Sequence, residues 1–186
     1  MNLPATRPEL VTARLQLRSY GPADAPDLQR LAGDKAVADT TLHIPHPYPD
    51  GAAEAWIGTH AARWAAREGL VFAITLRSTG ELLGSIGLVI QAAHEQAELG
   101  YWIGVPHWNQ GYATEAVRAV LDCGFRALEL NRIHAHHMAH NPASGRVMTK
   151  AGMQREGFGP QAMQKDGRAV DVVFYGARRE GWPPPG

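Results

Sequence analysis

The chain has 186 residues, of which 45% are hydrophobic, and this suits one domain, over residues 1–186, with a sizeable core. Lys and Arg together number 18, as do Asp and Glu, and no basic run or membrane-length apolar stretch appears, so neither direct nucleic-acid binding nor a membrane partner is expected. Cys123 is the only cysteine, so an intrachain disulfide is excluded, which fits a reducing cytoplasm and predicts a cytoplasmic protein.

In chain order, the first predicted elements are a strand at 14–19 and a helix at 22–32. A Pro-rich loop follows at 43–50. Asp50 is expected to cap the next helix and Gly69 to end it.

Period-two alternation then predicts three strands, at 70–76, 82–91 and 97–105. After a polar loop, the pattern predicts a helix at 112–128 and a strand at 132–140. A helix at 142–151, capped by Asn141 and ended by Gly152, and two last strands at 153–156 and 169–177 follow. This order predicts an α/β (α+β) fold, a mixed sheet of about six or seven strands with helices on both faces. The ends are polar or Pro-rich, so the ordered core is expected over roughly residues 10–180.

The loop between the strand at 97–105 and the helix at 112–128 has the features of an anion-binding site. Pro106 ends strand pairing because it has no N–H group, and Gly111 allows the backbone to turn closely. The first N–H groups of the helix have no internal partner, and the helix dipole adds positive charge. The loop lacks the Lys and the glycine spacing of the common nucleotide-binding motifs, so we expect it to hold a pyrophosphate mainly through backbone amides.

This loop resembles the pyrophosphate loop of the GNAT superfamily of CoA-dependent N-acetyltransferases, whose usual form is Gln/Arg-x-x-Gly-x-Gly/Ala. Gly111 and Ala113 fit that form, while Trp108 stands at its first position. With a Trp at this position, the loop resembles one branch of the family, the ribosomal-protein N-terminal (alanine/serine) acetyltransferases and their relatives. That branch reads Gly-Tyr-Trp, a short gap, then Trp-x-x-Gly-Tyr-Ala-Thr-Glu-Ala, as residues 100–102 and 108–116 do here.

A second motif agrees with the same branch. Asn141 and Ser144 resemble its Asn-x-x-Ser, and Lys150 and Gly152 resemble its Lys-x-Gly-Phe, with Met153 in the Phe position. The resemblance extends over the whole expected core. It implies a GNAT-type, mainly antiparallel sheet whose two central strands splay apart around the pantetheine arm of acetyl-CoA.

The resemblance also implies which residues contact acetyl-CoA as cosubstrate. A free backbone N–H near Trp102 or Ile103 would bind the thioester carbonyl, and the amides of 109–113 would hold the pyrophosphate. Asn141 would cap its helix and contact pantetheine. The predicted cofactor-binding residues are Trp102, Ile103, Trp108, Asn109, Gln110, Gly111, Tyr112, Ala113, Thr114, Asn141 and Ser144.

The proton donor for the leaving thiolate differs from the usual one. Many GNAT enzymes use a Tyr two residues before the Lys of the Lys-x-Gly motif, and that position is Met148 here, which cannot donate. Ser144 lies one helical turn earlier and is the nearest replacement. The alternative is that Ser144 only hydrogen-bonds the start of its helix.

For the proton acceptor, the sequence favours Glu98, because it lies on the central strand near the expected position of the amine. The alternative is that Glu98 is solvated or forms a structural salt bridge. Asp171 on the last strand could instead attract a cationic amine, and His46 and Tyr48 in the Pro-rich loop are predicted acceptor contacts. Tyr101 has the opposite strand parity to Glu98 and is expected to pack.

Nine histidines raise the question of a metal site. His134, His136 and His140 share one parity on their predicted strand, and two His at i and i+2 can ligate zinc, but the sequence offers no clear third ligand and no Cys pair. We therefore expect no metal and interpret these residues as a polar face lining a groove.

Together these features predict an acetyl-CoA-dependent N-acetyltransferase that acts on a primary amine. Two acceptors stay open: a protein N-terminus, which needs a long open groove, or a small amine such as a polyamine, an amino-acid analogue or an antibiotic, which needs a closed one. A third interpretation is an acyl-CoA-binding module without catalysis. The assembly is also open, with a homodimer among the alternatives.

Overall fold

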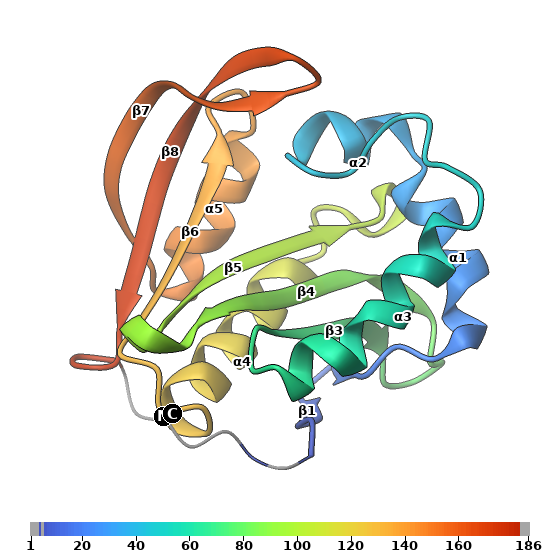
Figure 1. Cartoon of the computed structure of the whole chain (residues 1–186), viewed down its shortest axis with the longest axis horizontal. Coiled ribbons are helices and arrows are strands. Elements are labelled where there is room, and N and C mark those ends of the chain that lie inside the picture. Colours follow the sequence, from blue (N-terminus) through green and yellow to red (C-terminus); the bar gives the residue numbers. More distant parts are fainter. Residues whose placement is uncertain (1–3, 5, 183–186) are drawn as a thin grey trace.

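Eight strands form one sheet in the computed structural model, which describes residue 4 and residues 6–182. The sheet order is β1-β2-β3-β4-β5-β6-β8-β7, and every neighbouring pair is antiparallel except β5 and β6 (Figure 1). This confirms the predicted mixed, mainly antiparallel sheet. The strands are β1 Leu10–Val11, β2 Leu15–Arg18, β3 Gly69–Leu76, β4 Leu82–Gln91, β5 Gln96–Ile103, β6 Arg132–Met138, β7 Gln154–Lys165 and β8 Arg168–Arg178.

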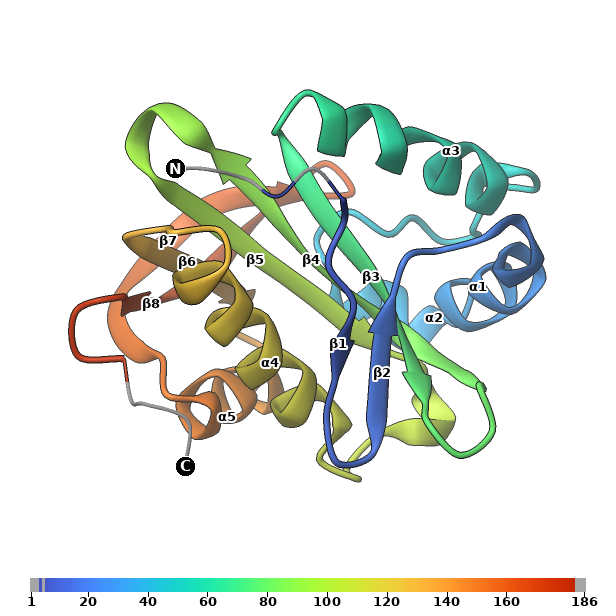
Figure 2. The same cartoon turned by 90° about the horizontal axis from the view of Figure 1, so that it is seen from below.

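The helices cover both faces of this sheet. On one face α1 and α3 pack around a small core that includes Tyr20, Leu28 and Ala53, and α2 follows α1 in the chain. On the other face α4 and α5 bury a larger core that includes Phe72 and Val117, and Figure 2 shows α3 and α4 on opposite sides of the strands. The helices are α1 Ala25–Ala32, α2 Lys35–Thr40, α3 Ala52–Ala65, α4 Tyr112–Arg126 and α5 Pro142–Ala151.

The two central strands separate as the resemblance implied. β5 and β6 pair in parallel at three positions only, the last of which joins Glu98 to His134. Beyond that pair the strands diverge, and Figure 1 shows the gap opening toward α2. Because a strand without a neighbour keeps free backbone N–H and C=O groups along its edge, this gap can accept a ligand as a substitute strand.

Several boundaries differ from the sequence prediction. The cap of α3 is Gly51, at φ 76°, and not Asp50, and the helix ends at Ala65 rather than at Gly69, which instead opens β3. The prediction failed there because Asp50 lies one residue too early to cap a helix that begins at Ala52.

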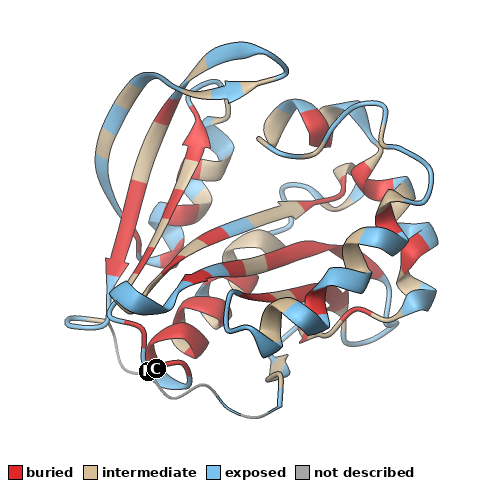
Figure 3. Cartoon of the chain, in the orientation of Figure 1, coloured by how far each residue is buried: buried red, intermediate tan, exposed pale blue. Residues whose placement is uncertain are grey.

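The short elements β1 and α2 were not predicted, because two and six residues are too few for a clear hydrophobic period. The last hairpin is longer than predicted, because β7 follows β8 through two register shifts. Every residue of β7 is exposed or intermediate in burial, so its apolar pattern is weak (Figure 3).

Candidate active site

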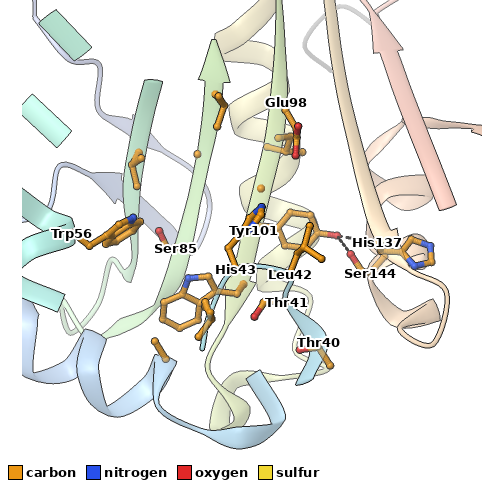
Figure 4. A pocket seen from close by; sticks show the side chains of 18 of the residues that line it. Thr40, Thr41, Leu42, His43, Trp56, Ser85, Glu98, Tyr101, His137 and Ser144 are labelled. Carbon is orange, nitrogen blue, oxygen red and sulfur yellow. Dashed lines mark hydrogen bonds between the residues drawn. The ribbon is translucent and has the colours of Figure 1, made fainter. Parts of the chain in front are cut away.

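Two cavities meet at the middle of β5. The wide cavity, of about 520 Å³, lies on the α1 and α3 face and is lined by these helices, by residues between 40 and 49, by β3, β4, β5 and β6, and by two residues of α5 (Figure 4). The loop cavity, of about 360 Å³, lies between the end of β5, residues 107–114 and α5. The two share Thr40, Thr41, Tyr101, Trp102 and Ser144.

Most residues of the predicted anion-binding loop line the loop cavity. Gly111 is the N-terminal cap of α4 at φ 82°, a left-handed conformation that disfavours residues with a Cβ. Gln110 does not line the cavity, because its side chain donates to the carbonyl of Pro106 at 3.2 Å. The other loop residues do line it: Trp108, Asn109, Gly111, Tyr112, Ala113 and Thr114.

Trp108 closes this loop onto β5. Its indole Nε1 donates to the carbonyl of Ile103 at 2.6 Å, and the residue stays 37% exposed. Trp108, which stands where the motif usually has Gln or Arg, therefore has a structural role, because its hydrogen bond fixes the distance between the end of β5 and the loop.

The start of α4 is tied to the first hairpin. The carboxylate of Glu115 accepts from the hydroxyl of Thr12 at 2.6 Å, from the backbone N–H of Arg14 at 2.9 Å and from its Nε at 2.7 Å. Burial raises the pKa of Glu115, but these hydrogen bonds and the charge of Arg14 outweigh it and leave the pKa below its usual value. The Arg14 guanidinium also lies 4.6 Å from the centre of the Tyr112 ring, so the loop starts from a rigid frame.

The backbone of β5 directs N–H groups into the gap. Gly104 donates its N–H to the carbonyl of Leu83 in β4 at 2.8 Å. Because N–H directions alternate along a strand, the N–H of Trp102 also faces β4, while those of Tyr101 and Ile103 face the gap. Of the two predicted donors to the thioester carbonyl, the alternation favours Ile103 over Trp102.

Tyr101 and Ser144 meet where the two cavities join. The Tyr101 hydroxyl donates to the carbonyl of Ser144 at 3.0 Å and lies 2.8 Å from its Oγ (Figure 4). Burial raises the pKa of Tyr101, and the hydrogen bond to Ser144 only partly offsets this, so the hydroxyl keeps its proton at neutral pH. Sequence parity had assigned Tyr101 to packing alone, and it missed this contact because the partner lies on α5, across the gap.

Asn141 holds Ser144 in place. Its side chain accepts from the N–H of Ser144 at 3.3 Å, as a helix cap does, and donates to the carbonyl of Thr40 at 3.2 Å. The predicted cap is thus confirmed, and the same side chain links α5 to α2. Met148, at the usual donor position, is buried with 1% exposure.

Glu98 faces the wide cavity beside a histidine. Its Oε1 lies 3.4 Å from Nδ1 of His136, and the two side chains are 36% and 13% exposed. Burial lowers the pKa of His136, and the nearby Glu98 charge only partly counters this, so the imidazole is mainly neutral at pH 7. Either group can accept a proton, and if the imidazole takes it, the neighbouring carboxylate charge stabilises the imidazolium.

A family model described as an acetyltransferase (GNAT) domain matches residues 14–154. The chain belongs to the GNAT acetyltransferase family. Among curated relatives, the uncharacterized N-acetyltransferase YoaA of Bacillus subtilis (strain 168) is 39% identical over 120 residues, which are 64% of this chain and 68% of that protein.

The ribosomal-protein branch of the GNAT family is also found among the relatives. The [ribosomal protein uS5]-alanine N-acetyltransferase of Escherichia coli (strain K12) is 26% identical over 152 residues, 75% of this chain and 72% of that protein. A solved structure of Mycobacterium smegmatis RimJ in complex with CoA-disulfide has a TM-score of 0.81 at 25% identity, and the match covers 91% of this chain and 84% of that chain. The matches to the first four curated relatives span only 54% to 68% of their own lengths.

Not all predicted acceptor contacts of this GNAT chain reach the wide cavity. Tyr48 lines it, and burial raises the pKa of its hydroxyl. His46 is exposed, with Nδ1 3.2 Å from the carbonyl of Gly33, and does not line it. Asp171 is exposed on β8, where its carboxylate accepts from the N–H of Gln161 at 2.8 Å, because a register shift in β7 turns that N–H toward it. Their acceptor roles stay predictions, and the geometry supports only Tyr48.

Two other classes of site, a metal centre and a membrane span, find no support among the described residues. Within residues 6–182 and at residue 4, no three His, Cys, Asp or Glu side chains lie together as a metal site would require. In the same part of the chain, no helix is long and apolar enough to cross a membrane.

Proposed function

We propose that this GNAT chain transfers an acetyl group from acetyl-CoA to a primary amine. The observation that carries the proposal is the meeting of two cavities at Tyr101 and Ser144. One cavity contains an amide-rich helix start, which suits a pyrophosphate, and the other contains Glu98 and His136, which suit a cationic amine.

The loop cavity fits acetyl-CoA. Backbone amides of residues 109–113 would bind the pyrophosphate, and the gap between β5 and β6 would accept the pantetheine arm. Arg146 and Lys150 line the same cavity from α5 and add positive charge for phosphate groups. Asn141, Ser144 and Ile103 complete the contacts at the thioester end.

Each step of the transfer has a residue suited to it. Glu98, with His136 beside it, takes a proton from the ammonium directly or through a water molecule. The backbone N–H groups of Ile103 and Tyr101 stabilise the negative oxygen of the tetrahedral intermediate. The leaving thiolate receives a proton from the hydroxyl pair of Ser144 and Tyr101.

For the acceptor, the wide cavity favours a small amine. Its volume of about 520 Å³ falls within the range of small-molecule sites, roughly 300–1,000 Å³. The name of the Escherichia coli relative supports the second candidate, a protein N-terminal amine. The cytoplasmic location and a homodimer stay predictions.

A panel assay tests this function. Acetyl-CoA is mixed with small amines, polyamines and peptides with free N-termini, thiol release is followed, and acetylated products are identified by mass spectrometry. Turnover of at least one amine supports the proposal. Acetyl-CoA binding, seen as a rise in melting temperature, without turnover of any amine would instead indicate a binding module.

A further inference from the structure

Arg63 places a positive charge on the wall of the wide cavity. It lies near the end of α3, is intermediate in burial, and lines the cavity. Its guanidinium makes no hydrogen bond or ion pair with any side chain or backbone group of residues 6–182. The guanidinium lies over Gly69: a Cβ added there would meet its Cζ, Nε and Nη2 at 3.4 Å each.

Strand register relates Arg63 to Glu98. Gly69 pairs with Val89, and Val89 pairs with Glu98, so the three residues form one row across β3, β4 and β5. Directly paired residues share a face of the sheet, and two strand spacings separate the Cα atoms of Gly69 and Glu98 by roughly 10 Å. The guanidinium above Gly69 and the carboxylate of Glu98 therefore lie on the same face, on opposite sides of Val89.

The rest of the wall carries little charge. Among the described residues that line the wide cavity, Glu98 is the only carboxylate and Arg63 the only Lys or Arg. A polyamine or another polycation would need further carboxylates for its distal ammonium groups. Most of the remaining lining is apolar or aromatic, including Leu28, Leu42, Ile44, Tyr48, Trp56, Val71 and Trp102.

We propose that the acceptor is an amino acid, or a close analogue, with an apolar or aromatic side chain. Its ammonium faces Glu98, its carboxylate binds the fork of Arg63, and its side chain packs on the apolar wall. The span needed is one hydrogen bond of about 3 Å at each end plus the short distance between the ammonium and the carboxylate of an amino acid. This sum is roughly the Cα separation of Gly69 and Glu98, above which the guanidinium and the Glu98 carboxylate lie. The inference rests on the proposed acetyl transfer.

The reaction balances without any further reactant. The amine nitrogen forms a bond to the thioester carbonyl carbon, and the carbon–sulfur bond breaks. The ammonium loses two protons in all: the first goes to the Glu98–His136 pair before attack and from there to water, and the second, released from the tetrahedral intermediate, restores the proton that Ser144 and Tyr101 give to the thiolate. The carboxylate held by Arg63 is unchanged, so its effect belongs in binding.

Matched acceptors test this assignment. Phenylalanine, phenylalaninamide and phenethylamine share one body, and only the first carries a carboxylate; the leucine series is the aliphatic equivalent. We expect kcat/KM to be roughly 10- to 100-fold higher for the acid. The readout is the ratio of kcat/KM for the acid to that for the amine: Arg63→Met should abolish the preference, mainly through the KM of the acid, and Arg63→Lys should keep part of it.

Arg67→Met is the matched control. Arg67 follows the same helix, is exposed and does not line the wide cavity, so its loss should leave the preference unchanged. Melting curves establish that each variant is folded. Equal turnover of acid and amine by the unchanged protein, or an equal loss for both in Arg63→Met, would overturn the inference while the proposed function stands. If no amine of any class is acetylated although acetyl-CoA binds, both fail.

Discussion

The two cavities that meet at Tyr101 are built in different ways. The loop cavity is formed largely by one continuous segment, the end of β5, the loop and the start of α4, together with one face of α5. The wide cavity draws side chains from α1, α3, α5, four strands and the residues between 40 and 49. A continuous segment shows its role in its own sequence, whereas a cavity assembled from distant segments depends on register and packing. Acetyl-CoA binding in the loop cavity should therefore be sensitive to changes at single backbone positions. Acceptor binding in the wide cavity should depend on a few charged side chains.

The largest effect is expected from Glu98→Gln. The change keeps size and polarity but removes the proton acceptor and the charge that attracts an ammonium. We expect kcat/KM at pH 7 to fall about 100-fold or more. The loss should shrink as pH rises, because free amine then becomes abundant.

Initial rates from pH 6 to 10 measure this, with Glu180→Gln, an exposed residue after β8, as the control. A loss that is the same at every pH would show that Glu98 is structural.

Next comes Gly111→Val, which tests the loop cavity. A β-branched residue at φ 82° is strained, and its Cβ would lie 3.3 Å from Nη2 of Arg14, at the point where the backbone must approach a phosphate. We expect the variant to lose the rise in melting temperature that acetyl-CoA produces.

Gly80→Val is the matched control for backbone strain. Gly80 has φ 75°, lies in the turn between β3 and β4, and has no atom within 4 Å of an added Cβ. It should melt at a lower temperature yet keep the full acetyl-CoA shift. A normal shift in folded Gly111→Val would remove the pyrophosphate from this loop.

A smaller effect is expected where the cavities join. Ser144→Ala should lower kcat about 10-fold and leave acetyl-CoA affinity unchanged, because the hydroxyl is assigned to the leaving thiolate. Tyr101→Phe should act similarly, and the double variant should lose less than the product of the two single effects, since the hydroxyls work as a pair. If only affinity or stability falls, Ser144 is a binding or capping residue.

The smallest effect is expected on stability at acid pH, from His60 on α3. His60 is 3% exposed, packs against Trp56 and Tyr20, and its ring nitrogens have no hydrogen-bond partner in the described part of the chain. Burial, with the charges of Arg7 and Arg63, lowers the pKa of His60 to about 4. The unfolded chain, with a pKa near 6.5, binds more protons between these values, so stability is full above about pH 6.5 and falls toward pH 4.

His60→Phe should flatten the melting temperature over that range. An unchanged slope would place the acid sensitivity elsewhere.

Much of the fold could be predicted from the sequence because its long elements have clear periods. β4 occupies the predicted range, and α4 and α5 begin where their cap signals place them. β1 and α2 are too short to show a period, and β7 is too exposed. The parting of β5 from β6 came only from the resemblance, since no pattern within either strand encodes its distance from the other.

For the site, too, features within one continuous segment could be predicted, and contacts between separate segments could not. Residues 108–114 could be predicted as a cosubstrate loop because they are continuous in sequence, and Glu98 as a proton acceptor because it lies on the adjoining strand; both roles stay predictions. His136 lies beside Glu98, and Arg63 lies over the same row of paired residues as Glu98, only because of how separate strands pair, and the hydroxyl of Tyr101 reaches Ser144 only across the gap. One sequence without this register cannot show such pairs. The available signal was weak: His136 has the strand parity of His134, which β6 pairs with Glu98.

The central claim is that both substrates occupy their cavities together and react where these meet. Initial velocities measured over a grid of acetyl-CoA and acceptor concentrations test it most directly. We expect reciprocal plots that intersect, because the amine attacks the thioester within one ternary complex. Parallel lines, with an acetylated protein trapped before the amine is added, would instead mean that the acetyl group first passes to the protein and that the two substrates do not react in one ternary complex.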